Sequence, residues 1–574
     1  METGKPLWLD EPSRMVRLSD KQDDVDAALA EITDNGISNR VWERDHTVWN
    51  QSPEEIENRL GWLDLPDEMT AQVERLCMFA NRARTDGFTH SVLLGMGGSS
   101  LAPEVFRKTF GVASGYLDLL VLDSTHPDVV ADVESRLDLS RTLFIVSSKS
   151  GGTAETLSLF KYFYNRTAAV VAPESLGSHF VAVTDPGTSL EALGRTLGFR
   201  EVFLANPNLG GRYSALSHFG LVPAALIGVD LKRLLSSALG AALACKWSDP
   251  ASVNPGVWLG AALGALAKAG RDKATFVASA QFASFGDWAE QLIAESTGKT
   301  GHGILPVVRE PLGDPGVYGS DRVFIEVYVA GDAREAVRLD ALAAAGHPVL
   351  QFGLADVYDL GAQMFLWEMA IAVAGHVMGI HPFNQPDVEA AKILARGAIE
   401  RYKDEGSLPG ETPSGASGNV DIFGGSADDP AQALAGLLAS ARTGDYVAIQ
   451  AYVRATPETD AALRVLRLRI RNETRLATTL GYGPRFLHST GQLHKGDAGG
   501  GLFVQITSEP TADIAIPDEP GSPTSSLSFG VLTAAEAGGD RQVLRDRARR
   551  IVGFHVRCDV CQTVERLQAW TPVD

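Results

Sequence analysis

Short apolar runs alternate with amphipathic stretches over residues 86–250. The runs that favour buried strands stand at 91–94 and 143–146 and within 117–125, 179–186 and 201–206. Between them, apolar residues recur three or four positions apart, as Leu157, Phe160 and Tyr164 do. Strands that alternate with helices predict an α/β unit, in which helices cover both faces of a parallel sheet.

A second unit of the same kind is expected over residues 251–405. Strand-like runs recur at 274–279, 323–329 and 348–354, and the segment from Leu360 to Met378 has the pattern of an amphipathic helix. An apolar helical region from Leu221 to about Gly270 connects the two units. Residues 1–85 have apolar positions at helical spacing and predict a helical N-terminal region.

Residues 406–574 predict an α/β C-terminal extension. It opens on a segment, 407–429, whose Gly, Ser, Pro and Asp content is typical of a linker. The runs 501–507 and 525–532, with a helix ending near 550–556, then echo the strands and helix of 321–379. The extension is a candidate partial repeat of the second unit, unless the two segments share only a strand–strand–helix periodicity.

Composition narrows the class of protein. The chain has 574 residues and a formal net charge of −20, which argues against general binding to nucleic acid or to an anionic membrane. The first residues lack an apolar signal core, and apolar runs such as GLVPAALIG are too short to cross a bilayer. We therefore expect a cytoplasmic protein with no membrane partner.

Four cysteines imply no disulfide framework. Cys558 and Cys561 form a lone C-x-x-C pair near His555. A zinc site needs more ligands than this pair supplies, so we expect free thiols and no metal.

The stretch from Thr142 to Phe160 carries the strongest chemical signal. Between its predicted strand and helix stand hydroxyl groups, an ammonium group and two glycines: Ser148, Lys149, Ser150, Gly151, Gly152 and Thr153. Free N–H groups and the positive end of the helix dipole favour an anion, and a phosphomonoester fits this arrangement. The alternative is a Ser/Gly-rich turn with ordinary helix caps. No GxxxxGK[ST] sequence is present, so this is not a Walker A loop.

A second glycine-rich turn follows the run 91–94. Gly98 lets the backbone approach a ligand closely, and Ser99 stands at the start of the next helix. Ligands of parallel sheets bind at the carboxyl ends of the strands, where both turns stand.

Arg212 and Glu295 are candidates for chemistry on such a ligand. Arg212 follows two glycines, and its permanently charged guanidinium would stabilise a developing oxyanion. Glu295 falls at the end of a predicted helix, where a carboxylate can act as a proton shuttle. The alternatives are a surface ion pair for Arg212 and a solvated helix end for Glu295.

Five separated motifs in this order resemble the phosphoglucose isomerase family over about residues 90–400: GMGGSS, SSKSGGTAET, GGRYSALS, ESTGK and NQPDVEAAK. The resemblance implies two sugar-isomerase (SIS) subdomains, 86–250 and 251–405, with parallel sheets flanked by helices, normally in a homodimer. It also implies the residues that would hold the sugar phosphate: Ser99, Ser148, Lys149, Ser150 and Thr153.

The same resemblance implies catalytic roles. Arg212 would stabilise a cis-enediol(ate) intermediate, Glu295 would move the proton between C1 and C2, and Lys392 would assist ring opening together with a histidine. The pocket would also be lined by Gly98, Gln291 and Gln385. Proton transfer beside a carbonyl needs a base and an oxyanion stabiliser, so we expect no cofactor.

The family's ring-opening histidine is missing from its usual place. The family has it between the motifs that contain Glu295 and Lys392, but the matching segment GVYGSDRVFIEVYV contains none. The extension contains GPRFLHSTGQLHKGDAGGGLFVQIT, which resembles the family's His-Ser-x-Gly-Gln segment. We therefore expect His488, from the same or a neighbouring subunit, to supply this group, with His494 as its competitor. A structural or surface histidine is the alternative.

The implied activity is that of a glucose-6-phosphate isomerase in carbohydrate metabolism (glycolysis and gluconeogenesis), which interconverts glucose 6-phosphate and fructose 6-phosphate. Two alternatives stay open: an isomerase that also takes mannose 6-phosphate, and a non-catalytic sugar-phosphate sensor on the same subdomains. The intact set of Glu295, Arg212 and Lys392 favours an enzyme. The extension further resembles bifunctional transaldolase/glucose-6-phosphate isomerases. The region before residue 90 is too short for a transaldolase barrel, so we expect the isomerase part alone.

Overall fold

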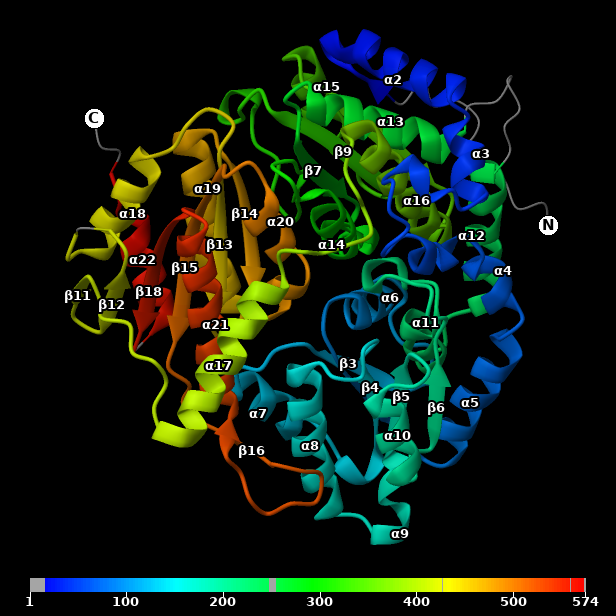
Figure 1. Cartoon of the computed structure of the whole chain (residues 1–574), viewed down its shortest axis with the longest axis vertical. Helices are drawn as coiled ribbons and strands as arrows, with labels where there is room; N and C mark the ends of the chain where they lie inside the picture. The colour runs from blue at the N-terminus through cyan, green and yellow to red at the C-terminus, as the bar shows by residue number, and fades with distance from the viewer. Residues whose placement is uncertain (1–15, 247–253, 426, 558, 572–574) are drawn as a thin grey trace.

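The computed structural model describes residues 16–246, 254–425, 427–557 and 559–571. Within them, three large sheets are each flanked by helices, and a small two-stranded sheet completes the fold (Figure 1). The fold class expected from the sequence, α/β with parallel sheets covered by helices, is confirmed.

The first sheet is parallel throughout and has the strand order β3-β2-β4-β5-β6. Its strands are β2 (His90–Gly95), β3 (Asp118–Leu122), β4 (Thr142–Ser147), β5 (Phe180–Thr184) and β6 (Glu201–Leu204). The strands expected in this region are therefore confirmed. Gly95 pairs with Ser147, so the two glycine-rich turns that follow β2 and β4 leave the sheet side by side. The helices of this unit are α6 (Leu101–Phe110), α7 (Pro127–Ser135), α8 (Ala154–Ala168), α9 (Pro173–Leu176), α10 (Ser189–Thr196) and α11 (His218–Leu226).

The second sheet has the order β1-β10-β9-β7-β8, with only the edge strand β1 antiparallel. Its strands are β7 (Lys273–Ala278), β8 (Leu305–Val307), β9 (Arg322–Val329), β10 (Val349–Leu354) and β1 (Val16–Arg17). Its helices are α12 (Leu231–Lys246), α13 (Pro255–Lys268), α14 (Phe285–Thr297), α15 (Ala336–Ala344), α16 (Leu360–Met378) and α17 (Glu389–Glu405). The N-terminal helices α2 (Gln22–Asp34), α3 (Ile37–Trp42), α4 (Leu65–Thr70) and α5 (Val73–Thr85) pack on these two units.

Helix α16 has the expected bounds but is not amphipathic. Nearly all its side chains are buried, because α12, α13 and α14 surround it. In the described part of the chain, Val357–Met378 is the one helical segment long and apolar enough to cross a membrane, and 89% of its apolar window is buried inside the protein. A helix that is apolar all round is typical of a core helix.

The C-terminal sheet has the order β11-β12-β18-β15-β13-β14. Its parallel strands are β13 (Tyr446–Tyr452), β14 (Ala477–Tyr482), β15 (Gly501–Ser508) and β18 (Arg550–Val556), and β11 (Gly415–Ser417) and β12 (Val420–Phe423) are antiparallel at one edge. Its helices are α18 (Pro430–Ala439), α19 (Pro457–Thr474), α20 (Gly491–Gly496), α21 (Phe529–Asp546) and α22 (Val560–Gln568). The small sheet pairs β16 (Ala515–Ile516) with β17 (Leu527–Ser528).

The second and third sheets share one topology. Taken in chain order, the parallel strands of each lie fourth–third–first–second across the sheet, as β10-β9-β7-β8 and as β18-β15-β13-β14. A repeat predicts this shared order, but one of the elements matched in the sequence was wrong. The counterpart of β10 is β18, not residues 525–532, which hold the short β17 and the start of α21. The segment 407–429 is also not simply a linker, since it contains β11 and β12.

Single turns of 3₁₀-helix connect many of these elements. Three of them flank the site described below: η6 (Gly97–Ser99), η9 (Gly211–Tyr213) and η13 (Arg485–His488). The others are η2 (Ser19–Lys21), η3 (His46–Val48), η4 (Glu57–Arg59), η5 (Gly61–Leu63), η7 (Leu139–Arg141), η8 (Gly177–His179), η10 (Ala280–Phe282), η11 (Pro315–Val317) and η12 (Val357–Asp359).

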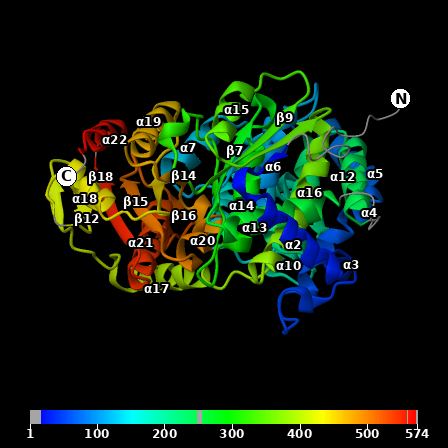
Figure 2. The ribbon, with the colours of Figure 1, turned by 90° about the horizontal axis from the view of Figure 1, so that it is seen from above.

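The C-terminal unit lies beside the other two rather than apart from them. In both views α18 and α22 lie at one end of the molecule and α4 and α5 at the other (Figures 1 and 2). Helix α17 packs along α21, and β16 packs on α8, so the extension contacts both other units. Residues from all three units therefore meet near the middle of the molecule.

Candidate active site

A cavity of about 260 Å³ lies where the three units meet. The first unit contributes the loop after β4 and the start of α8, the second contributes α17, and the extension contributes η13, α20 and α21. Among the predicted site residues, its lining includes Ser150, Thr153, Lys392 and His488.

The loop after β4 has the geometry of an anion-binding turn. Ser148 Oγ lies 2.9 Å from Thr153 Oγ1, and the backbone N–H of Gly152 donates to Ser150 Oγ at 3.4 Å. Gly151 has a φ of +69°, and a Cβ there would lie 2.7 Å from Thr188 Cβ, so the turn requires glycine at this position. Helix α8 starts directly after the loop and points its N-terminus at the cavity.

Lys149 is not placed with the other members of this loop. Its ammonium forms an ion pair with Asp185 and lies 3.4 Å from the carbonyl oxygen of Pro207, and it does not line the cavity. The expectation that Lys149 binds the ligand stays a prediction, and in this structure its ammonium faces the carboxylate of Asp185.

The turn after β2 brings two other segments to the site by close backbone approach. A Cβ on Gly98 would lie 2.0 Å from the carbonyl oxygen of Gly211, which precedes Arg212. A Cβ on Gly97 would lie 2.8 Å from the carbonyl oxygen of His488. Gly98 therefore packs against the η9 turn and does not line the cavity, and neither does the buried Ser99.

Arg212 and Glu295 form the centre of a buried polar network. Arg212 is 1% exposed, and its Nη1 lies 3.2 Å from Glu295 Oε1 and donates to Gln385 Oε1 at 2.9 Å. Its Nε donates to Ser296 Oγ at 2.8 Å, and its Nη2 donates to the carbonyl oxygen of Pro382 at 2.6 Å. The structure thus brings together the residues that three separate motifs contributed.

Gln291 joins this network to the cavity. Its Nε2 donates to Glu295 Oε2 at 3.0 Å and to the carbonyl oxygen of His488 at 2.8 Å. Gln291 and Glu295 lie on α14, one turn apart, so their side chains share a face. Arg212, Glu295, Gln291 and His488 are therefore linked by contacts within a single chain.

His488 faces a carboxylate that the sequence analysis did not single out. His488 Nε2 lies 2.6 Å from Glu155 Oε1, and the two side chains are 15% and 9% exposed. Burial raises the pKa of Glu155, but the facing His488 outweighs this effect and brings that pKa to about 2. Glu155 belongs to the SSKSGGTAET motif, and a carboxylate in the first turn after a phosphate-type loop is the signal that could have identified it.

The competing histidine lies elsewhere. His494 is 2% exposed and packs among the rings of Tyr446, Phe486 and Phe503. Burial lowers its pKa well below the ordinary histidine range. It does not line the cavity, so the structure favours His488 over His494.

Lys392 lies on the first turn of α17 at the cavity, as the sequence indicated. Its ammonium has no hydrogen-bond or ion-pair partner among the described residues, and its charge helps to lower the pKa of Glu155. A free cation beside a hydroxyl-rich turn is available to an anionic ligand.

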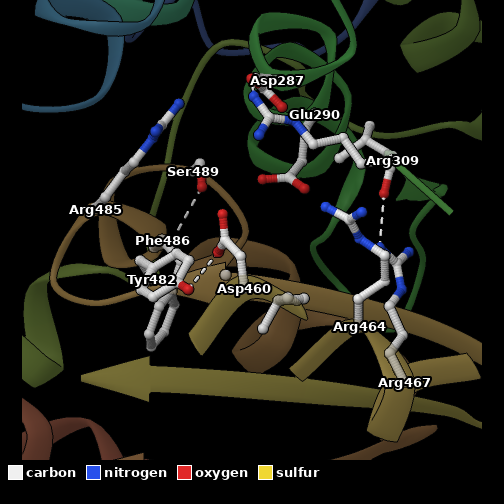
Figure 3. Close-up of a pocket in the computed structure, with 13 residues that line it drawn as sticks. Asp287, Glu290, Arg309, Asp460, Arg464, Arg467, Tyr482, Arg485, Phe486 and Ser489 are labelled. Atoms are coloured by element: carbon white, nitrogen blue, oxygen red, sulfur yellow. Dashed lines mark hydrogen bonds and ion pairs between the residues drawn. The ribbon is translucent and has the colours of Figure 1, made fainter. Parts of the chain in front are cut away.

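A second cavity, of about 110 Å³, lies on another side of α14 (Figure 3). Arginines line it, but most of them have partners within the protein: Arg309 pairs with Asp287, Arg485 lies 3.3 Å from Asp123, and Arg467 donates to the carbonyl oxygens of Thr478 and Val308. Figure 3 shows Asp287 and Glu290 on α14 facing these arginines. None of the predicted site residues lines this cavity, so the cavity lined by Ser150, Thr153, Lys392 and His488 is the candidate active site.

Within the described residues, no group of three or more His, Cys, Asp or Glu side chains could hold a metal ion. Cys77, Cys245 and Cys561 are free thiols, whereas Cys558 of the predicted C-x-x-C pair lies outside the described residues.

The chain is similar to known sugar-phosphate isomerases. Residues 67–300 match the family model of phosphoglucose isomerase. A glucose-6-phosphate isomerase of Carboxydothermus hydrogenoformans is 28% identical over 413 residues, which cover 59% of this chain and 85% of that protein. One of Rubrobacter xylanophilus is 28% identical, covering 60% of this chain and 90% of that protein. The crystal structure of a hypothetical protein from Thermus thermophilus is 25% identical and superposes with a TM-score of 0.57, over 67% of this chain and 99% of that one. Together with the five ordered motifs, these similarities relate the chain to the phosphoglucose isomerase family, whose model matches residues 67–300.

Proposed function

We propose that this protein is a glucose-6-phosphate isomerase, which interconverts glucose 6-phosphate and fructose 6-phosphate by proton transfer. The observation that carries the proposal is the convergence of three chemical groups in one chain. A phosphate-type loop and the His488–Glu155 pair line one cavity, and Gln291 links the Arg212–Glu295 pair to the backbone of His488. The similarity to glucose-6-phosphate isomerases over most of their length supports it.

In this proposal the hydroxyls of Ser148, Ser150 and Thr153 and the N-terminus of α8 bind the sugar phosphate. The free ammonium of Lys392 adds positive charge at the same place. Binding through the phosphate positions the remote end of the sugar for reaction, which is a use of binding energy for orientation.

Ring opening is assigned to His488. The proton of the O1 hydroxyl is removed and the ring oxygen O5 is protonated, while the C1–O5 bond breaks and C1 becomes a carbonyl carbon. A histidine side chain can both donate and accept a proton, and the Glu155 carboxylate orients the ring through its contact with Nε2.

Isomerisation is assigned to Glu295 and Arg212. The Glu295 carboxylate removes the C2 proton of the open-chain aldose, a C1=C2 double bond forms, and the C1 carbonyl oxygen takes the negative charge of a cis-enediol(ate). The proton is then returned to C1 while the O2 hydroxyl proton passes to O1, so that C2 becomes the carbonyl carbon. Arg212, whose Nη1 lies 3.2 Å from Glu295, stabilises the negative charge that develops on the oxygen.

A non-catalytic sensor needs only the phosphate-binding loop. Burying the charge of Arg212 beside Glu295 has a desolvation cost in folding free energy. A role in catalysis would explain why the chain keeps this pair, and this favours an enzyme. We further propose that the enzyme acts in the cytoplasm, in the glycolytic and gluconeogenic use of sugar phosphates.

The test is a coupled assay of fructose 6-phosphate conversion to glucose 6-phosphate with the full chain. We expect turnover with the wild type and none with Glu295→Gln. A wild type that binds fructose 6-phosphate but does not convert it would overturn the proposal in favour of a sensor.

A further inference from the structure

A second carboxyl group lies behind Glu155 in the wall of the cavity. Glu536, on α21, is 6% exposed and lines the same cavity as Glu155 and His488. Thr125 Oγ1 donates to Glu536 Oε2 at 3.2 Å, and the carboxyl groups of Glu536 and Glu155 are within hydrogen-bonding contact. Neither the phosphate loop nor the isomerisation chemistry uses Glu536.

Contact between these two buried carboxyl groups disfavours the ionisation of both. Two buried carboxylates in contact repel each other, so a proton on one of them is favoured. The His488 side chain faces Glu155 and keeps that group ionised. Burial and the charge of Glu155 raise the pKa of Glu536 well above the ordinary range, which favours Glu536 as the group that carries a shared proton.

Among the described residues, no cationic side chain forms an ion pair with Glu536. Asp540, one turn along α21, forms a buried ion pair of 2.5 Å with Lys495 of α20. Lys392 lies at the mouth of the cavity on α17. Thr125 Oγ1 donates to Glu536 Oε2, and the cavity that Glu536 lines is also lined by the cationic side chains of Arg396 and Lys495.

We propose that Glu536 is a positioning residue for ring opening, which donates its carboxyl proton to one oxygen of Glu155 and thereby leaves Glu155 Oε1 to accept from His488 Nε2. This inference rests on the proposed function and on the assignment of His488 within it. The hydrogen bond holds Glu155, which in turn holds the imidazole ring. Because Nε2 of His488 contacts Glu155, Nδ1 is the ring nitrogen of His488 that remains for the substrate. Glu536 transfers no net proton to the sugar.

Ring opening and isomerisation can be measured separately. Exchange between the α and β anomers of glucose 6-phosphate, followed by NMR, requires ring opening but not the action of Glu295. The coupled assay requires both steps. The variants are Glu536→Gln, whose amide can still donate to Glu155, and Glu536→Leu, which cannot. Asp546→Asn, an exposed change on the same helix, is the matched control.

We expect Glu536→Leu to lose anomer exchange by about tenfold or more, with little change in KM, and Glu536→Gln to retain several times more exchange than Glu536→Leu. The wild type should lose exchange at alkaline pH as Glu536 ionises, whereas Glu536→Gln should lack that loss. Full exchange in Glu536→Leu, or equal loss in the two variants with an identical alkaline limb, would overturn the proposal.

A spectroscopic measurement tests the proton without any need for activity. The infrared difference spectrum of wild type minus Glu536→Gln at neutral pH should contain the carbonyl stretch of a protonated carboxylic acid. Its absence would overturn the inference. A wild type with no isomerase activity that still shows this band would instead mean that the proposed function fails while the protonated Glu536 stands.

Discussion

His488 Nε2 lies 2.6 Å from Glu155 Oε1, although 333 positions separate the two residues in the chain. One belongs to the C-terminal extension and the other to the first helix turn after the phosphate-type loop. This contact places the extension inside the candidate active site. It also accounts for the missing histidine of the second unit, because another part of the same chain presents a histidine to the site.

Replacing His488 tests its role in ring opening. We expect His488→Ala to slow anomer exchange and isomerisation of glucose 6-phosphate by about 10²–10⁴-fold, since a general acid–base group contributes that much. The measurements are NMR exchange and the coupled assay. His302→Ala, an exposed histidine, is the control and should retain both rates. Normal anomer exchange in His488→Ala would assign ring opening to another residue.

Replacing Glu295 should abolish isomerisation but leave ring opening intact. Glu295→Gln keeps the side-chain shape next to Arg212 Nη1 but lacks a base. We expect isomerisation to be lost while anomer exchange and sugar-phosphate binding persist, as measured by NMR and by calorimetric titration with fructose 6-phosphate. Isomerisation at a near-normal rate would remove Glu295 from its role.

The two ends of the phosphate-type loop should respond differently to substitution. Thr153 lines the cavity, whereas the Lys149 ammonium is paired with Asp185 outside it. We expect Thr153→Val to raise KM for fructose 6-phosphate several-fold more than Lys149→Met does, by loss of about 1 kcal/mol of hydrogen bonding. Steady-state kinetics of both variants decide the matter. A larger KM effect for Lys149→Met would show that the lysine turns toward the substrate.

The site should work without a second subunit, because every proposed catalytic side chain comes from one chain. Mixing His488→Ala with Glu295→Gln should therefore restore no isomerase activity, and the specific activity of wild type should stay constant on dilution. Coupled assays beside sedimentation measurements check both. Recovered activity in the mixture would mean that the site is shared between subunits.

Two buried histidines should make the fold less stable in mild acid. Burial lowers the pKa of His218 and of His347 to about 4. Unfolded histidines bind a proton near pH 6.5, so the unfolded state binds more protons between about pH 6.5 and 4, and stability falls as the pH falls through that window. The expected loss at pH 5.5 is about 1 kcal/mol for each histidine.

Urea unfolding at pH 7 and pH 5.5 measures this loss. We expect His218→Gln to weaken the pH dependence of the unfolding midpoint, and the exposed His302→Gln to leave it as in the wild type. An unaltered pH dependence in His218→Gln would show that His218 is protonated in the folded state.

The order of apolar runs and glycine-rich turns was sufficient to predict the α/β class and most strands of the first two sheets. Buried parallel strands and the turns after them depend on local pattern, so β2 and β4 could be predicted to within one residue at each end. Arg212, Glu295 and the hydroxyl-rich loop could also be chosen as candidate site residues from the sequence, because each stands in a short motif at the end of an element. The repeat in the extension was matched to one wrong element, because short apolar runs do not distinguish a strand from the start of a helix such as α21.

Contacts between distant segments were decided only by the tertiary structure. Pairing of Gly95 with Ser147 sets the two turns side by side, and packing of α17 and α21 beside α8 brings Lys392, His488 and Glu536 to one cavity. The same packing turned Lys149 toward Asp185 and buried His494 among aromatic rings. A sequence specifies which side chains can do chemistry, but burial and the partner that faces each group fix its charge, and both depend on residues hundreds of positions away.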